Sequence, residues 1–119
     1  GDVVATLIPN LPAQAEAHFG VPACGAVLNT INTRLDTGTV SYIFAHGGAK
    51  IVLVDSQFLS LAEAACADMD GEAPVIIKCP MIKPAFPLLG AIKPMRICWL
   101  LAIQIFPGTC PRMNGKAYP

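Results

Sequence analysis

Four short runs rich in apolar and β-branched residues, separated by stretches with helical spacing, constrain most strongly what this chain can fold into. The runs are VVATLI, AVLNTI, KIVLV and VIIKC, at residues 3–8, 26–31, 50–54 and 75–79. Strands that are buried on both faces have such compositions, and their alternation with helices predicts a parallel sheet with right-handed crossovers. The expected fold class is therefore α/β: an open, incomplete, parallel Rossmann-like βαβαβαβ sheet, followed by an irregular tail.

Helix-boundary residues separate the first two runs. Asn10 is expected to cap a helix that tolerates Pro12 at an early position, with Glu16 near the positive end of the helix dipole. Gly20 and Pro22 are expected to kink or shorten this helix.

Two further helices are expected after the second and third runs. The second is capped by Asp36 or Thr37, extends through Ala45 and is stopped by Gly47-Gly48. The third is capped by Ser56. The apolar residues expected to face the core are Val40, Ile43 and Phe44 in the second helix, and Leu59, Ala62, Ala65 and Cys66 in the third.

The composition suits a piece that other protein covers. The 119 residues are enough for one domain, but 54% are apolar and only 13% are charged, against about 25% charged in an average domain. The eight acids all lie at or before Glu72, where two cations accompany them, so residues 1–72 carry a net −6 and residues 73–119 carry +6. This asymmetry is typical of a basic tail that binds nucleic acid or lipid, or of two segments with different origins.

The cysteines and the longest apolar run point to neither a metal site nor a membrane span. The five cysteines form no C-x-x-C pair, so free, buried thiols are expected and no metal ligands. Residues 97–106, ICWLLAIQIF, are the longest apolar run, and a span needs about 20 residues. No transmembrane helix and no targeting segment are expected.

Polar residues gather where the second strand should end. Ligands of parallel sheets bind beyond the carboxyl ends of the strands, and Asn32, Thr33 and Arg34 lie at such an end. Arg34 can pair with a phosphate while Asn32 holds the loop by an Asx-type bond. Alternatively, Arg34 pairs with Asp36 or with a neighbouring segment, and Asn32 only ends the strand.

The other titratable residues have structural explanations. His46 gains from the dipole at a helix C-terminus, and His18 is expected to pack or hydrogen-bond within the first helix. The acids Asp68, Asp70 and Glu72 are expected to form a solvated turn. No catalytic residue and no metal ligand are therefore assigned.

Three blocks of the sequence resemble one enzyme family. GDVVATLIPN, HFGVPACGAVLNTINTRLD and HGGAKIVLVD are similar to the start of the AMP-forming acyl-CoA synthetases, also called AMP-binding or acyl-activating enzymes. LNTINTRL is most similar to the plant-type branch, which activates short, medium or aromatic carboxylic acids. The resemblance covers residues 1–79 only, which are expected to form a partial N-terminal domain, and residues 80–119 are an unassigned basic, proline-rich tail.

The resemblance implies an ATP-dependent acid–thiol ligase of the kind used in fatty acid metabolism. Such a ligase joins a carboxylate to the α-phosphate of ATP with release of pyrophosphate, and coenzyme A then displaces AMP to give acyl-CoA. The implied cofactors of the full-length family are ATP, Mg2+ and coenzyme A. The resemblance places Asn32, Thr33 and Arg34 near the coenzyme A nucleotide.

The sequence departs from the family in its phosphate-binding elements. It has no Ser/Thr/Gly-rich loop ending in Pro-Lys-Gly and no catalytic lysine of the family type. The chain is therefore expected to be an inactive fragment that binds none of the cofactors tightly. A frame change, a retained intron or a truncated gene model would each produce its tail.

Two other functions stay open from the sequence. One is a non-catalytic binding module that pairs with a full-length homologue, and the other is a lipid-surface protein that uses the basic tail. The intact enzyme is expected to act on a carboxylic acid, and no nucleic-acid partner is expected. The chain is expected to be intracellular, either cytoplasmic or peroxisomal, and to be able to self-associate through exposed faces of its sheet.

Overall fold

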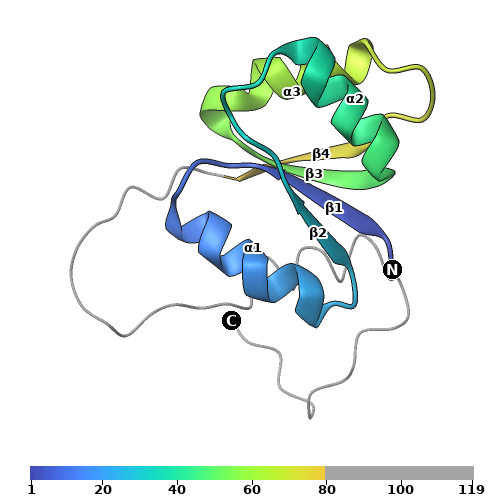
Figure 1. Ribbon diagram of the computed structural model, residues 1–119. Coiled ribbons are helices and arrows are strands. Elements are labelled where there is room, and N and C mark those ends of the chain that lie inside the picture. The colour runs from blue at the N-terminus through green and yellow to red at the C-terminus, as the bar shows by residue number, and fades with distance from the viewer. Residues whose placement is uncertain (80–119) are drawn as a thin grey trace.

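The computed structural model describes residues 1–79 as a four-stranded parallel sheet between two helical layers (Figure 1). The strands are β1 (Val3–Leu7), β2 (Val27–Thr30), β3 (Ala49–Asp55) and β4 (Val75–Cys79). The helices are α1 (Pro12–Ala23), α2 (Thr37–Gly47) and α3 (Leu59–Ala67), and a 3₁₀ turn, η1 (Ser56–Phe58), precedes α3. The expected α/β class and the order of elements are confirmed.

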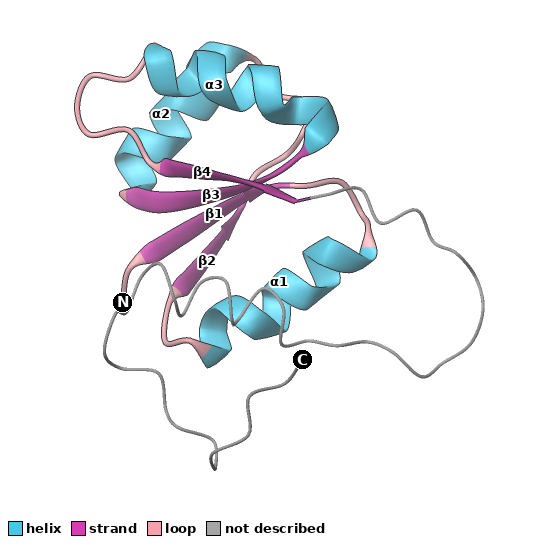
Figure 2. Cartoon of the chain, turned by 180° about the vertical axis from the view of Figure 1, so that it is seen from behind, coloured by secondary structure: helices cyan, strands magenta, loops and turns pink. Residues whose placement is uncertain are grey.

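The sheet has the strand order β2-β1-β3-β4, and every neighbouring pair is parallel. Helix α1 lies on one face of the sheet, and α2 and α3 lie on the other (Figures 1 and 2). The strands at the two edges, β2 and β4, have no further neighbour within residues 1–79. The sheet is therefore open, as expected.

Alternation along β3 divides the apolar interior into two cores. Ile51 and Leu53 pack in the core beneath α1, whereas Val52 and Val54 pack in the core beneath α2 and α3. Successive side chains of a strand point to opposite faces, so a strand covered on both faces needs apolar residues at every position. For this reason the last four residues of KIVLV are all apolar, and all four are buried.

Helix α1 begins differently from the expectation. Leu11 is the N-cap residue and provides no side-chain cap, so the expected cap at Asn10 is wrong. Pro12 starts the helix with a fixed φ and without an N–H that would need a partner, which explains why a polar cap is dispensable. Glu16 lies beyond the first turn. The helix also continues through Gly20 and Pro22 to Ala23, so neither residue shortens it.

Helix α2 has a well-defined start and stop. The Asp36 carboxylate accepts hydrogen bonds from the backbone N–H of Thr39 at 3.0 Å and from the Thr39 hydroxyl at 2.7 Å. At the other end, Gly48 has φ +62°, a left-handed conformation that favours glycine. Of the two residues expected to cap this helix, the structure selects Asp36.

The start of α3 corrects a further expectation. Ser56 is not the cap, because Asp55 accepts a hydrogen bond of 3.0 Å from the backbone N–H of Gln57 and caps η1 instead. The expected apolar stripe is confirmed: Ala62 and Ala65 are buried, and Leu59 and Cys66 pack against them.

The tail and its apolar run, residues 97–106, lie outside the described residues, as do Cys98 and Cys110. Within residues 1–79, no helix is long and apolar enough to cross a membrane. The three cysteines in this part of the chain, Cys24, Cys66 and Cys79, form no disulfide with one another and are only partly buried, so the expected burial is met in part.

Candidate functional site

One hydrogen bond to β1 and one within the loop hold the loop that follows β2 in place. The backbone N–H of Ile31 donates to the carbonyl of Thr6 on β1, at 2.9 Å, which extends the strand pairing by one residue. Beyond it, the Oδ1 atom of Asn32 accepts a bond of 3.0 Å from the backbone N–H of Arg34. This is the Asx-type bond expected from the sequence, and it turns the chain away from the sheet.

Arg34 is exposed at the tip of this loop, and no ion pair involves it within residues 1–79. The alternative pairing with Asp36 is not formed, because the Asp36 carboxylate is engaged by Thr39. The bond from the Thr39 hydroxyl has the largest effect on the pKa of Asp36, followed by the bond from the Thr39 backbone N–H. Together they hold this pKa below its ordinary value. The guanidinium of Arg34 is therefore available to a ligand at the carboxyl edge of the sheet.

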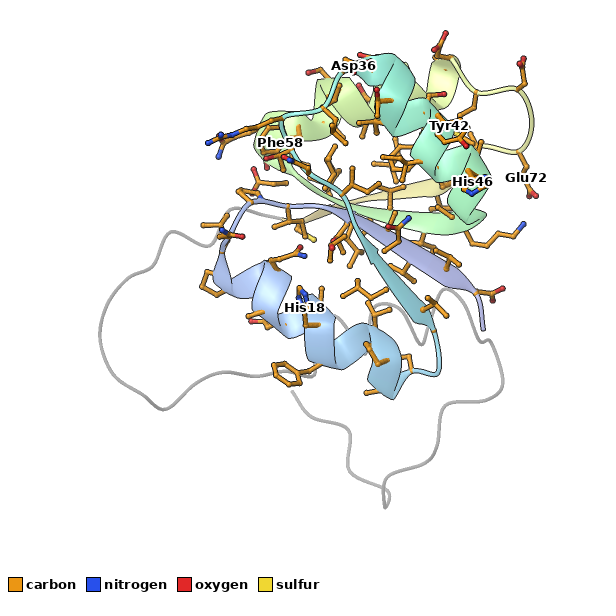
Figure 3. All side chains as sticks on the ribbon, in the orientation of Figure 1. His18, Asp36, Tyr42, His46, Phe58 and Glu72 are labelled. Carbon is orange, nitrogen blue, oxygen red and sulfur yellow. The ribbon has the colours of Figure 1, made fainter. Side chains whose placement is uncertain are left out.

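The junction of β3 and η1 lies at the same edge, and the sequence pattern did not single it out. Asp55, the last residue of β3, is buried and caps η1, and Phe58, the last residue of η1, packs against the core beneath α2 and α3 (Figure 3). An aspartate directly after a strand and before a helix is an N-cap signal, and it could have identified Asp55.

Cys79, the last residue of β4, lies at the same edge of the sheet. Cys79 is the register partner of Asp55. Burial, with added repulsion from the charges of Asp55 and Glu16, raises the pKa of Cys79 to about 11. The thiolate is the nucleophilic form of cysteine, so this thiol is unreactive at neutral pH.

The two histidines do not form a joint site. Nδ1 of His18 lies 2.7 Å from the carbonyl oxygen of Gln14 within α1, the local bond expected from the sequence. His46 lies in the last turn of α2 and stacks on Tyr42, with ring centroids 5.3 Å apart. Because α1 and α2 cover opposite faces of the sheet, the histidines are on opposite sides of the molecule (Figure 3).

The acidic turn before β4 is solvated, as expected. Asp68, Asp70 and Glu72 are exposed, and the Glu72 carboxylate lies 3.2 Å from the Lys50 ammonium. Among residues 1–79, no group of three His, Cys, Asp or Glu side chains is placed to hold a metal ion.

Comparisons with known proteins cover most of the described fold. The sequence model of a family described as "AMP-binding enzyme" matches residues 1–91, beyond the boundary at residue 79 that the motifs suggested. A peroxisomal acetate/butyrate–CoA ligase of Arabidopsis thaliana is 44% identical over 82 residues, which are 69% of this chain and 14% of that protein. A peroxisomal trans-cinnamate:CoA ligase of Petunia hybrida is 53% identical over 64 residues, 54% of this chain and 11% of that protein.

A solved structure supports the same fold. The crystal structure of a Brucella canis acyl-CoA synthetase superposes with a TM-score of 0.57 and 23% sequence identity, covering 76% of this chain and 15% of that one. At this identity the likeness shows the fold alone. The chain spans about a seventh of the length of the ligase from Arabidopsis thaliana.

Proposed function

Because the chain belongs to the AMP-binding enzyme family, we propose that residues 1–79 are part of the N-terminal domain of an AMP-forming acyl-CoA ligase. The intact enzyme would convert a carboxylate, ATP and coenzyme A into acyl-CoA, AMP and pyrophosphate, with Mg2+ on the phosphates. The family match, which spans all eight elements of the fold, is the single observation that carries this proposal.

The loop of Asn32, Thr33 and Arg34 is proposed to contact the coenzyme A nucleotide in that enzyme. Its chemistry fits a phosphate, since an exposed guanidinium without an ion pair in residues 1–79 can form charge-assisted bonds to phosphate oxygens. The bond between Asn32 and the Arg34 backbone reduces the freedom that this loop would lose on binding.

The 119-residue chain by itself is proposed to be inactive. Adenylation needs positioned donors and cations around the triphosphate, and the sequence contains no Ser/Thr/Gly-rich loop ending in Pro-Lys-Gly. ATP–pyrophosphate exchange by the purified chain, with short-chain or aromatic acids, tests this point. A signal above that of a heat-treated sample would contradict it.

The substrate class and the location rest on the relatives. One is named for acetate and butyrate, another for trans-cinnamate, and both names include the word peroxisomal. We therefore propose a short or aromatic carboxylic acid as the substrate of the intact enzyme and an intracellular, peroxisomal location.

A chimera tests the ligase proposal directly. Residues 1–79 would replace the matching segment of the acetate/butyrate–CoA ligase, and acyl-CoA formation would be measured. We expect a soluble chimera that retains activity, because the replaced segment then supplies the same strands and loops. A soluble chimera that still forms the acyl-adenylate but no thioester would contradict the proposal that the loop of Asn32, Thr33 and Arg34 contacts coenzyme A. Loss of both steps would contradict the domain assignment.

The two non-catalytic functions remain predictions of the sequence with simple tests. Co-purification of the chain with a full-length homologue would support the binding module. Sedimentation with anionic vesicles that is lost in a chain ending at Cys79 would support the lipid-surface protein. The domain boundary is tested by sequencing the transcript across codons 73–95, because a different reading frame there would separate the tail from the ligase segment.

A further inference from the structure

The loop between α3 and β4 contains the only Asp-Gly step in the sequence, formed by Asp70 and Gly71. Residues 68–74 connect Ala67, the last residue of α3, to Val75, the first residue of β4. This loop projects from the rest of the fold (Figure 1), and both Asp70 and Gly71 are exposed. The chain thus presents at its surface a dipeptide whose side chain and main chain can react with each other.

The groups that would react are both free. An aspartate can form a five-membered imide with the backbone nitrogen of the next residue when neither group is held elsewhere. Within residues 1–79 the Asp70 carboxylate has no ion pair or hydrogen bond, and the Gly71 N–H has no acceptor. Gly71 has φ +132°, which favours glycine, and the space in which a Cβ would lie is empty. Neither a bond nor steric crowding therefore opposes the attack.

Three of the other aspartates lack this freedom. The Asp36 carboxylate is held by Thr39, and the buried Asp55 carboxylate is held by the backbone N–H of Gln57. Asp2 precedes a β-branched valine, whose side chain crowds its own backbone nitrogen.

Asp68 is the closest comparison, because it is exposed in the same loop as Asp70. It precedes Met69, whose backbone N–H donates to the carbonyl of Cys66 at 3.4 Å. The two sites therefore differ in whether the fold holds the nitrogen that would attack.

We propose that Asp70 is a site of spontaneous conversion to isoaspartate in the folded protein. The Gly71 nitrogen attacks Cγ of the protonated Asp70 carboxyl, so that an N–Cγ bond forms and the Cγ–OH bond breaks. The hydroxyl leaves as water with the proton of the N–H. A second water then adds to the main-chain carbonyl carbon of Asp70 and breaks its bond to the Gly71 nitrogen. One water is released and one is taken up, so the product has the mass of the original chain.

The conversion adds one methylene to the main chain between α3 and β4. The added length falls between two anchored points. Met69 packs against the core beneath α2 and α3, and Glu72 pairs with Lys50 of β3. Within residues 1–79, β4 is an edge strand that pairs with β3 alone. The modification therefore acts on the connection that positions this strand.

Incubation of the folded chain in heavy-oxygen water at mildly acidic pH tests the proposal, with the same chain in urea as the reference. Opening of the imide places one solvent oxygen in the product, and isoaspartate resists an endoproteinase specific for aspartate, so peptide mass spectrometry locates each converted site. Comparing the folded and unfolded rates at each site removes the effect of the neighbouring residue type. We expect Asp70 to convert as fast in the folded chain as in urea, and Asp68 to convert several times more slowly.

Two controls keep the result interpretable. Asp70→Glu retains the charge but requires a six-membered ring, so it should abolish oxygen uptake at this position. Asp55 is buried and reports on molecules that unfold during the incubation. The proposal is wrong if folding slows conversion of Asp70 by the same factor as that of Asp55, because the reaction then occurs only in unfolded molecules. Equal slowing of Asp68 and Asp70 would also overturn it.

Discussion

The Oδ1 atom of Asn32 accepts a hydrogen bond of 3.0 Å from the backbone N–H of Arg34, so one side chain sets the path of the loop that carries the proposed ligand-binding guanidinium. Asn32→Ala should lower the free energy of unfolding by about 0.5–1.5 kcal/mol, the usual net value of one hydrogen bond. Asn32→Asp keeps an acceptor at the same place and should change it less. Urea unfolding followed by circular dichroism measures both, and equal losses would contradict a role for the bond.

Arg34→Ala in the chimeric ligase should raise the KM for coenzyme A about tenfold or more, because loss of a hydrogen bond to a charged group costs about 1.5–3 kcal/mol. The rate of ATP–pyrophosphate exchange should stay unchanged, because coenzyme A enters only the second step. Lys50→Ala is the control, since this cation pairs on the surface with Glu72. A similar rise of the KM in both variants would show that the effect comes from the change in net charge and not from a contact of Arg34 with coenzyme A.

Asp36 is predicted to titrate below its ordinary pKa because it caps α2 through Thr39. Since the pKa is lower in the folded state, the stabilisation is present above the unfolded pKa and is lost as pH falls through the folded value. Thr39→Val removes the hydroxyl, the largest contribution, and should raise the Asp36 pKa in an NMR titration of the carboxyl carbon. Asp36→Asn should remove the titration while keeping part of the cap. An unchanged Asp36 pKa in Thr39→Val would contradict the assignment.

Phe44 and Phe19 form a matched pair for testing the core. Phe44 of α2 is fully buried, and Phe19 of α1 is 73% exposed. Phe44→Ala should cost about 3–5 kcal/mol, a large share of the total stability of about 5–15 kcal/mol that is typical of a domain. Phe19→Ala should stay within about 0.5 kcal/mol. Thermal unfolding measures both, and Phe44→Leu gives a milder variant if Phe44→Ala does not fold.

The raised pKa of Cys79 leads us to expect a loss of stability at alkaline pH. Its pKa is raised from 9.0 to about 11 in the folded state, mainly by burial. The unfolded chain therefore releases this proton first, so the stabilisation is complete below pH 9 and falls as pH rises toward 11. Cys79→Ser, whose hydroxyl does not titrate there, should flatten this part of the stability profile. Glu16→Gln should lower the Cys79 pKa, as read from the pH dependence of alkylation.

Particular elements show how far local sequence reasoning reaches. The continuous apolar runs of β1 and β3 predicted strands covered on both faces, and the parallel sheet confirms them, because a two-sided strand has no polar positions to alternate. Cap positions were less predictable. Asn10 and Ser56 both have suitable side chains, yet α1 begins after Leu11, η1 begins after Asp55 and α3 begins after Phe58.

The candidate site divides in the same way. The sequence identified Asn32, Thr33 and Arg34 at a strand end, together with the Asx-type bond. It could not decide whether Arg34 pairs with Asp36, because that depends on Thr39 engaging the Asp36 carboxylate in the folded helix.

The sequence by itself thus determined the α/β class, the order of strands and helices and the family, since apolar periodicity and short motifs are properties of neighbouring residues. Only the tertiary structure decided the strand order β2-β1-β3-β4, the side of the sheet on which each helix lies, and the approach of the Glu16 carboxylate to Cys79. These features join residues as far apart as Glu16 and Cys79. Such pairings follow from how complete elements pack, which no local pattern encodes.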